Sequence, residues 1–146
     1  MKVQKLLHTR MRVSDLDQTI QFYTSVLGLE VIEHKTSPRG SQLAFLKVPN
    51  SDELIELTSF PPSGPVKVQE DLIHLAFQVD SLDQTITSLN AQGITITDGP
   101  TKTSSGSRFI SDCARTRPRA RSRAKRAPRP GRPPLSAPYL VGGTGV

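Results

Sequence analysis

Two histidines, His8 and His74, occupy the same position of an internal repeat. The offset in sequence that separates them also separates segment 16–20 from segment 82–86, and both segments read LDQTI. A repeat of this length indicates two copies of one structural unit that pack on each other. Because neutral imidazole is a common metal ligand, two histidines at equivalent positions are candidates for two halves of one metal site.

Glu56 is the candidate carboxylate for the same site. Nitrogen ligands combined with a hard oxygen ligand suit Zn²⁺, Ni²⁺, Co²⁺ or Fe²⁺. The structural alternatives are that each histidine is an ordinary core or surface residue and that Glu56 is a solvated charge in an alternating strand. The shared repeat position of His8 and His74 favours the metal site. His34 has no partner in the repeat and is expected at the surface.

The second copy of the repeat lacks a counterpart of Glu56. Constant spacing would place an acidic residue at 121 or 122, and these positions hold Arg121 and Ser122. No Asp, Glu or His occurs after Asp112. We therefore expect the second copy to be incomplete, without its last strand.

The elements that would position these side chains follow the same order in both copies. Residues 5–13 alternate as a strand, and Ser14 is expected to cap a helix that ends at Gly28. Strands are expected at 29–35, 42–48 and 53–59 in the first copy, and at 72–79, 94–97 and from 107 in the second, with a helix from Leu82 to Gly93. The predicted fold class is α+β, with two βαβββ modules of which the second is incomplete.

The composition divides the chain near residue 111. Residues 1–110 carry ten Lys and Arg against twelve Asp and Glu, whereas residues 111–146 carry nine against one. We predict one domain over 1–110, with module one at 5–59 and module two at 72–110, followed by a disordered basic tail rich in Arg, Pro and Ala.

Several classes of protein are disfavoured by the same counts. No apolar run has the length of a membrane span or of a signal-peptide core, so we expect no membrane contact and a cytoplasmic location. The one cysteine, Cys113, allows no intramolecular disulfide. A small core favours a homodimer. The tail could make non-specific phosphate contacts with nucleic acid, but it has no aromatic residue before Tyr139, so this function is not favoured.

Three motifs resemble a known family. They are residues 8–13 (HTRMRV), 53–58 (ELIELT) and 73–76 (IHLA). With these motifs, segment 6–110 resembles the vicinal oxygen chelate (VOC) superfamily, and within it most closely glyoxalase I (lactoylglutathione lyase). The resemblance implies a VOC domain over 1–110 and metal-dependent isomerisation of the methylglyoxal–glutathione hemithioacetal to S-lactoylglutathione.

The resemblance also implies roles for individual residues. His8, Glu56 and His74 match metal ligands, with Zn or Ni as the metal and Co or Fe as further candidates. Glu56 matches a catalytic carboxylate that moves the substrate proton. Arg12 matches an arginine that contacts a carboxylate of glutathione, which suits its bidentate guanidinium.

Two departures from the family pattern bear on activity. Ser59 and Phe60 stand where the family has an asparagine that holds glutathione, and the eighth-strand motif with its glutamate ligand is missing. The loss of this ligand predicts impaired isomerisation. The alternatives are a non-catalytic VOC protein that binds a small ligand or a metal, or another VOC activity such as an epimerase or a thiol transferase.

Overall fold

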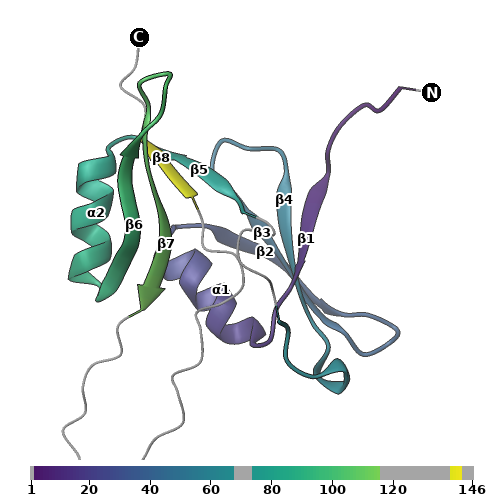
Figure 1. Cartoon of the computed structure of the whole chain (residues 1–146). Coiled ribbons are helices and arrows are strands. Elements are labelled where there is room, and N and C mark those ends of the chain that lie inside the picture. Colours follow the sequence, from purple (N-terminus) through teal and green to yellow (C-terminus); the bar gives the residue numbers. More distant parts are fainter. Residues whose placement is uncertain (1, 68–73, 116–138, 143–146) are drawn as a thin grey trace, which may run out of the picture. The chain divides into compact units, whose positions relative to one another are not determined.

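The computed structural model describes residues 2–67, 74–115 and 139–142 (Figure 1). The chain divides into two compact units, Met1–Lys67 and Val68–Val146. Each unit combines one α-helix with a four-stranded sheet. Neither of these helices is long and apolar enough to cross a membrane.

The first unit has the predicted βαβββ order. Its elements are β1 (His8–Arg12), α1 (Leu16–Ser25), β2 (Glu30–Thr36), β3 (Gln42–Lys47) and β4 (Leu54–Ser59), followed by the short 3₁₀ helix η1 (Pro61–Ser63). The strand order is β1-β4-β3-β2, with β1 parallel to β4 and the other neighbours antiparallel. The first and last strands of the unit are therefore adjacent, although α1, β2 and β3 lie between them in sequence.

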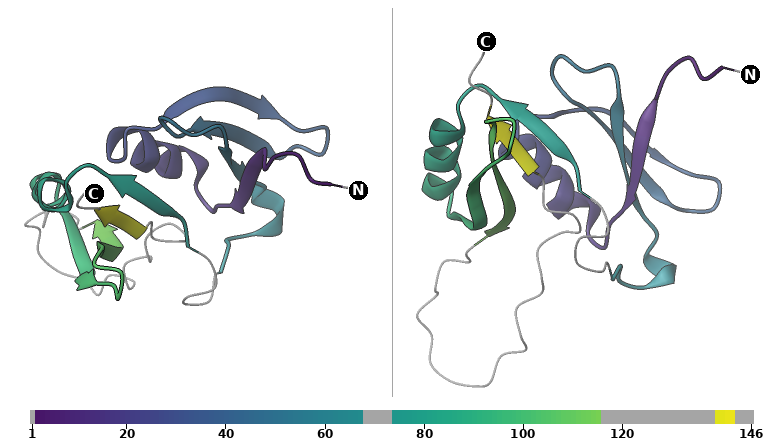
Figure 2. Two further views of the ribbon diagram at one scale, coloured as in Figure 1. Left: turned by 90° about the horizontal axis from the view of Figure 1, so that it is seen from above. Right: turned by 45° about the horizontal axis from the view of Figure 1, so that its top comes forward.

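Helix α1 packs against β2, β3 and β4 and covers one face of this sheet (Figure 2). Its buried residues, Leu16, Thr19 and Tyr23, recur at helical spacing. Successive side chains of a strand point to opposite faces, so the buried Met11 and Leu57 lie on the other face of the sheet from Arg10 and Glu56. The alternation therefore separates an apolar core face from a face that carries charged side chains.

The N-cap of α1 lies one residue later than predicted. Asp15, not Ser14, is the N-cap, and its side chain accepts a hydrogen bond from Gln18 N at 2.9 Å. Ser14 Oγ instead accepts a hydrogen bond from Val66 N at 2.9 Å. Both residue types are good caps, and the bond to Val66 gives Ser14 a partner outside the helix that local sequence cannot show.

The second unit repeats this topology. Its elements are β5 (Ala76–Val79), α2 (Leu82–Ala91), β6 (Ile94–Lys102), β7 (Arg108–Arg115) and β8 (Tyr139–Gly142). The strand order β5-β8-β7-β6 matches that of the first unit, and the two helices begin at equivalent positions of the repeat, Leu16 and Leu82. The repeat predicted from the sequence and the α+β fold class are both confirmed.

A bidentate ion pair joins the second helix to its sheet. Arg108 of β7 donates to both carboxylate oxygens of Asp83, in the first turn of α2, at 2.9 and 3.1 Å. Ser81 caps the same helix by accepting a hydrogen bond from Gln84 N. Leu82 and Leu89 of this helix are buried.

The second module ends in a short strand, β8, that the sequence analysis did not place. Strand β7 continues to Arg115, and β8 lies between β5 and β7, with Phe77 and Ile110 both in register with Leu140. Tyr and Val favour strands. Insertion of β8 gives backbone partners to two strand edges, those of β5 and β7, that would otherwise be exposed. The arginines and prolines that led to the prediction of a disordered tail lie mainly at 116–138. These residues, which include Arg121 and Ser122, lie outside the described part of the chain.

Replacing Leu140 by proline should destabilise the second unit. Proline removes a backbone donor, and β8 is hydrogen-bonded to a strand on each side. The lost bond should cost about 1–3 kcal/mol, and each kcal/mol lowers the melting temperature of a chain of this size by about 2–4 °C. Thermal unfolding followed by circular dichroism would measure the change. Ser136→Pro, which lies before the strand, is the control, and equal melting temperatures for the two variants would contradict the placement of β8.

Candidate functional site

A buried carboxylate, that of Glu56 on β4, lies at the centre of the candidate site. Its side chain is 1% exposed, and it stands in register with Arg10 of the parallel neighbour β1. Its Oε1 lies 2.7 Å from an Arg10 guanidinium nitrogen and accepts a hydrogen bond from Thr58 Oγ1 at 3.1 Å. Its Oε2 lies 3.2 Å from His8 Nε2. The two oxygens of the carboxylate therefore have different partners.

The surroundings of Glu56 keep it ionised. Burial by itself raises the pKa of this carboxyl group, but the hydrogen bonds from Arg10 and Thr58 and the charge of Arg10 outweigh burial. The net effect is a pKa below the ordinary value of 4.5. At neutral pH the site therefore contains an ionised, buried carboxylate.

The imidazole of His8 lies between Glu56 and an aromatic ring. Phe45 of β3 is in register with Glu56 and meets the His8 ring edge to face, with 5.8 Å between ring centroids. Lys35 Nζ lies 4.6 Å from the centroid of the same phenyl ring. These contacts hold His8 Nε2 toward Glu56 while 41% of the side chain stays exposed.

The pair formed by His8 and Glu56, here called the His8–Glu56 pair, suits a divalent metal. Two donors on one metal with bonds of about 2.1 Å and tetrahedral or octahedral angles lie roughly 3.0–3.4 Å apart. The observed 3.2 Å between His8 Nε2 and Glu56 Oε2 falls within this range. In the described ranges no group of three or more His, Cys, Asp or Glu side chains is gathered for a metal, so the pair supplies two donors.

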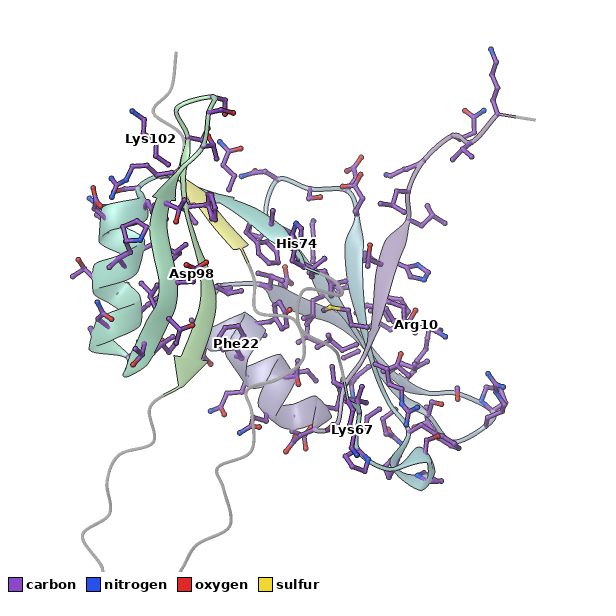
Figure 3. The ribbon with its side chains drawn as sticks, in the orientation of Figure 1. Arg10, Phe22, Lys67, His74, Asp98 and Lys102 are labelled. Carbon is purple, nitrogen blue, oxygen red and sulfur yellow. The ribbon has the colours of Figure 1, made fainter. Side chains whose placement is uncertain are left out.

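His74, the third predicted ligand, belongs to the second unit. It is exposed and lies two residues before β5, so the strand predicted over 72–79 begins at Ala76, while residues 72 and 73 are outside the described part (Figure 3). The role of His74 as a ligand stays a prediction.

Arg12, the predicted substrate contact, binds the backbone of the segment that follows β4. One of its guanidinium nitrogens donates to Gly64 O at 3.3 Å and lies 3.5 Å from Phe60 O. The side chain is thus held next to Phe60, the position that departs from the family pattern. Its contact with a substrate carboxylate stays a prediction.

Arg10 is the residue of this candidate site that the sequence analysis missed. Arg10 belongs to β1 (Figure 3). It lies on the same face as His8, because residues two apart in a strand share a face. The signal available in the sequence is the alternation of His8, Arg10 and Arg12 along one strand. Alternation alone does not identify the strand that neighbours β1, and so it does not give the Arg10–Glu56 register.

The second unit has no acidic residue at the position equivalent to Glu56. Arg10 pairs with Glu56 in the first sheet, and its counterpart in the repeat, Ala76, pairs with Tyr139 in the second. The equivalent register position is therefore residue 139 rather than 121 or 122, because the connection from β7 to β8 is longer than the repeat spacing predicts. A tyrosine therefore stands at the register position that Glu56 has in the first sheet.

Comparison with known proteins gives a consistent family match. Residues 5–116 match the profile of the Glyoxalase/Bleomycin resistance protein/Dioxygenase superfamily. The sequence is 30% identical to a probable lactoylglutathione lyase of Vibrio cholerae over 113 residues, which cover 75% of this chain and 82% of that protein.

Solved structures show the same fold. The trypanothione-dependent glyoxalase I of Leishmania major is similar with a TM-score of 0.62 and 24% identity, over 96% of this chain and 86% of that one. An antibiotic-binding protein of Streptomyces, TnmS3, is similar with a TM-score of 0.66 and 18% identity, over 99% of each chain.

The lowered pKa of Glu56 predicts a loss of stability in acid. Because the folded-state pKa lies below the unfolded one, ionised Glu56 contributes stability above about pH 4.5, which is lost as the pH falls through the folded-state pKa. Urea unfolding between about pH 7 and about pH 3 should show a smaller acid-dependent loss of unfolding free energy in Glu56→Gln than in the parent. Glu30→Gln, at an exposed carboxylate on β2, should behave as the parent. Parallel pH profiles for the parent and Glu56→Gln would contradict the assignment.

Proposed function

Because the chain belongs to the glyoxalase/bleomycin resistance protein/dioxygenase superfamily, we propose that it is a metal-dependent isomerase of the glyoxalase I type. The substrate would be the hemithioacetal of methylglyoxal and glutathione, and the product S-lactoylglutathione. The observation that carries the proposal is the His8–Glu56 pair. His8 Nε2 lies 3.2 Å from Glu56 Oε2, and the side chain of Glu56 is 1% exposed. The relative of Vibrio cholerae named above is a probable lactoylglutathione lyase.

The proposed metal ligands are His8, Glu56 and His74. The first two fit a divalent cation by their separation and chemistry, and His74 would add a second imidazole from the other unit. Three protein ligands are a common set at catalytic zinc, which leaves room for substrate. A bound Zn²⁺ or Ni²⁺, or Co²⁺ or Fe²⁺, would stabilise the negative charge that develops on the substrate oxygens.

Glu56 is the proposed proton-transfer group. Isomerisation moves one hydrogen from C1 of the hemithioacetal to C2, with no net oxidation, so one carboxylate can in principle accept the proton and return it. Arg10 and Thr58 hold Oε1 and leave Oε2 on the side of His8. The same partners lower the pKa of Glu56, which keeps it deprotonated but makes it a weaker base than a carboxylate with a pKa near neutrality.

The rest of the proposed site would bind the thiol portion of the substrate. Arg12 would exchange its bonds to the backbone of Phe60 and Gly64 for a substrate carboxylate. The second unit supplies no acid at the register position of Tyr139. Loss of one well-placed proton-transfer group usually costs about 10²–10⁴ in rate, so we propose a slow isomerase.

The proposal includes a cytoplasmic homodimer. The buried apolar core that the described part of the second unit provides is small and consists of Leu82, Leu89, Ile94 and Ile110. A unit with such a small apolar core is stabilised when it buries more apolar surface against a second copy of the chain. The one cysteine of the sequence is typical of a protein that does not rely on disulfides, as in the cytosol.

A second candidate is a non-catalytic protein that binds a small ligand or a metal. It is favoured by the missing acid in the second unit and by the ion pair that occupies Oε1 of Glu56. The fold is compatible with such a role, since TnmS3 is an antibiotic-binding protein with the same fold.

An assay of S-lactoylglutathione formation separates the two candidates. With Ni²⁺ or Zn²⁺ added, we expect a rate about 10²–10⁴ below that of the Vibrio cholerae relative assayed in parallel. Glu56→Gln should remove the remaining activity, because an amide cannot accept the substrate proton. Glu53→Gln, which changes a nearby exposed carboxylate, should leave the rate within about twofold of the parent.

Three other results would change the conclusion. A parent rate equal to that of the relative would show that the missing acid is not needed. Equal rates for Glu56→Gln and the parent would exclude Glu56 as the base. Binding of metal and substrate analogue with no product would establish the binding protein.

A further inference from the structure

A cationic side chain of the protein, that of Arg10, lies beside the proposed metal site. Arg10 lies 2.7 Å from Oε1 of Glu56, and 58% of its side chain is exposed. Thr58 donates to the same oxygen, so Oε1 has two partners. Oε2 faces His8 at 3.2 Å. The carboxylate that would bind a metal therefore has a guanidinium attached before any metal arrives.

We propose that Arg10 is a built-in counter-ion of Glu56, which orients the carboxylate and at the same time weakens its affinity for a divalent cation. The inference rests on the proposed function, because it takes Glu56 as a metal ligand. Arg10 is a positioning residue in this account and acts through Glu56.

Two effects of Arg10 on metal affinity oppose each other. By holding Oε1, Arg10 fixes the carboxylate in one orientation, and losing this order would weaken binding by a few-fold. Its positive charge repels a metal on the other oxygen. For a divalent and a monovalent cation about 5 Å apart, the repulsion costs more than about tenfold in association constant even at the dielectric constant of water. Repulsion is therefore the larger effect.

The occupation of Oε1 also limits how Glu56 can bind a cation. With Arg10 and Thr58 on Oε1, the carboxylate offers a single oxygen. Calcium commonly takes carboxylates through both oxygens, whereas zinc and similar ions bind readily through one oxygen combined with imidazole nitrogen. Arg10 thereby favours small transition-metal ions at this site.

Calorimetric titration of the full chain with Co²⁺ tests the role of Arg10. Arg10→Met removes the charge at similar length, and Arg10→Gln removes the charge but keeps an N–H donor. Both variants should bind Co²⁺ about tenfold more tightly than the parent at low salt, and the difference should shrink as ionic strength rises. The control is Arg39→Met, which makes the same charge change in the exposed turn between β2 and β3 and should alter affinity by less than about twofold.

The possible failures are distinguishable. Unchanged or weaker Co²⁺ binding in both Arg10 variants overturns the inference, and so does loss of the folded state in both, because Arg10 would then be a residue required for folding and not one that acts on metal affinity. If one variant fails to fold, as judged by circular dichroism, the other decides.

A Glu56→Gln variant separates this inference from the proposed function. If Glu56→Gln weakens Co²⁺ binding but the Arg10 variants do not strengthen it, the role of Arg10 alone is wrong. If Glu56→Gln binds Co²⁺ as the parent does, or if the parent and both Arg10 variants show no binding, the proposed function fails, and this inference fails with it.

Discussion

The ionised carboxylate of Glu56, buried on a sheet face, is the constraint on which the rest of the site depends. An isolated charge is costly to remove from water, so each of its oxygens needs a polar partner nearby. The parallel pairing of β1 and β4 provides Arg10 in register with Glu56, and the strand alternation provides Thr58 and His8 on the same face. The same alternation directs Met11 and Leu57 into the core beneath α1. One strand pairing thus determines both the core and the chemistry.

The second sheet obeys the same topological constraint with different residues. Its first strand, β5, pairs in parallel with β8, which follows β7 in sequence after a long connection. The backbone pattern of the repeat is therefore preserved, while the register position of Glu56 is taken by Tyr139. Any short segment that favours a strand can complete the sheet, whereas proton transfer requires a particular functional group. This difference explains how the second unit keeps its topology without an acidic residue.

Much of this fold could be predicted from sequence because the repeat is explicit. The identical segments 16–20 and 82–86 place both helices, and turn residues bound most strands within one or two positions. The closeness of His8 to Glu56 came from resemblance to a family, since no local pattern links residues so far apart in sequence. The role of Arg10 depends on which strand neighbours β1, which is a long-range property.

The strand at 139–142 was missed for a different reason. A composition dominated by arginine and proline describes an average over a segment, and four residues within it can still pair with neighbouring strands. Short strands gain their stability from tertiary partners. Whether such a strand forms therefore depends on unpaired strand edges elsewhere in the chain, which its sequence alone does not show.

X-ray absorption spectroscopy of the zinc-loaded chain tests the central claim most directly, because it reports the atoms bound to the metal. We expect two imidazole nitrogens, from His8 and His74, at about 2.0–2.1 Å, together with oxygen ligands. Replacing His74 by alanine should remove one imidazole contribution, whereas the same change at the exposed His34 of β2 should remove none. A spectrum without imidazole, or one that is the same in His74→Ala and the parent, would contradict the claim.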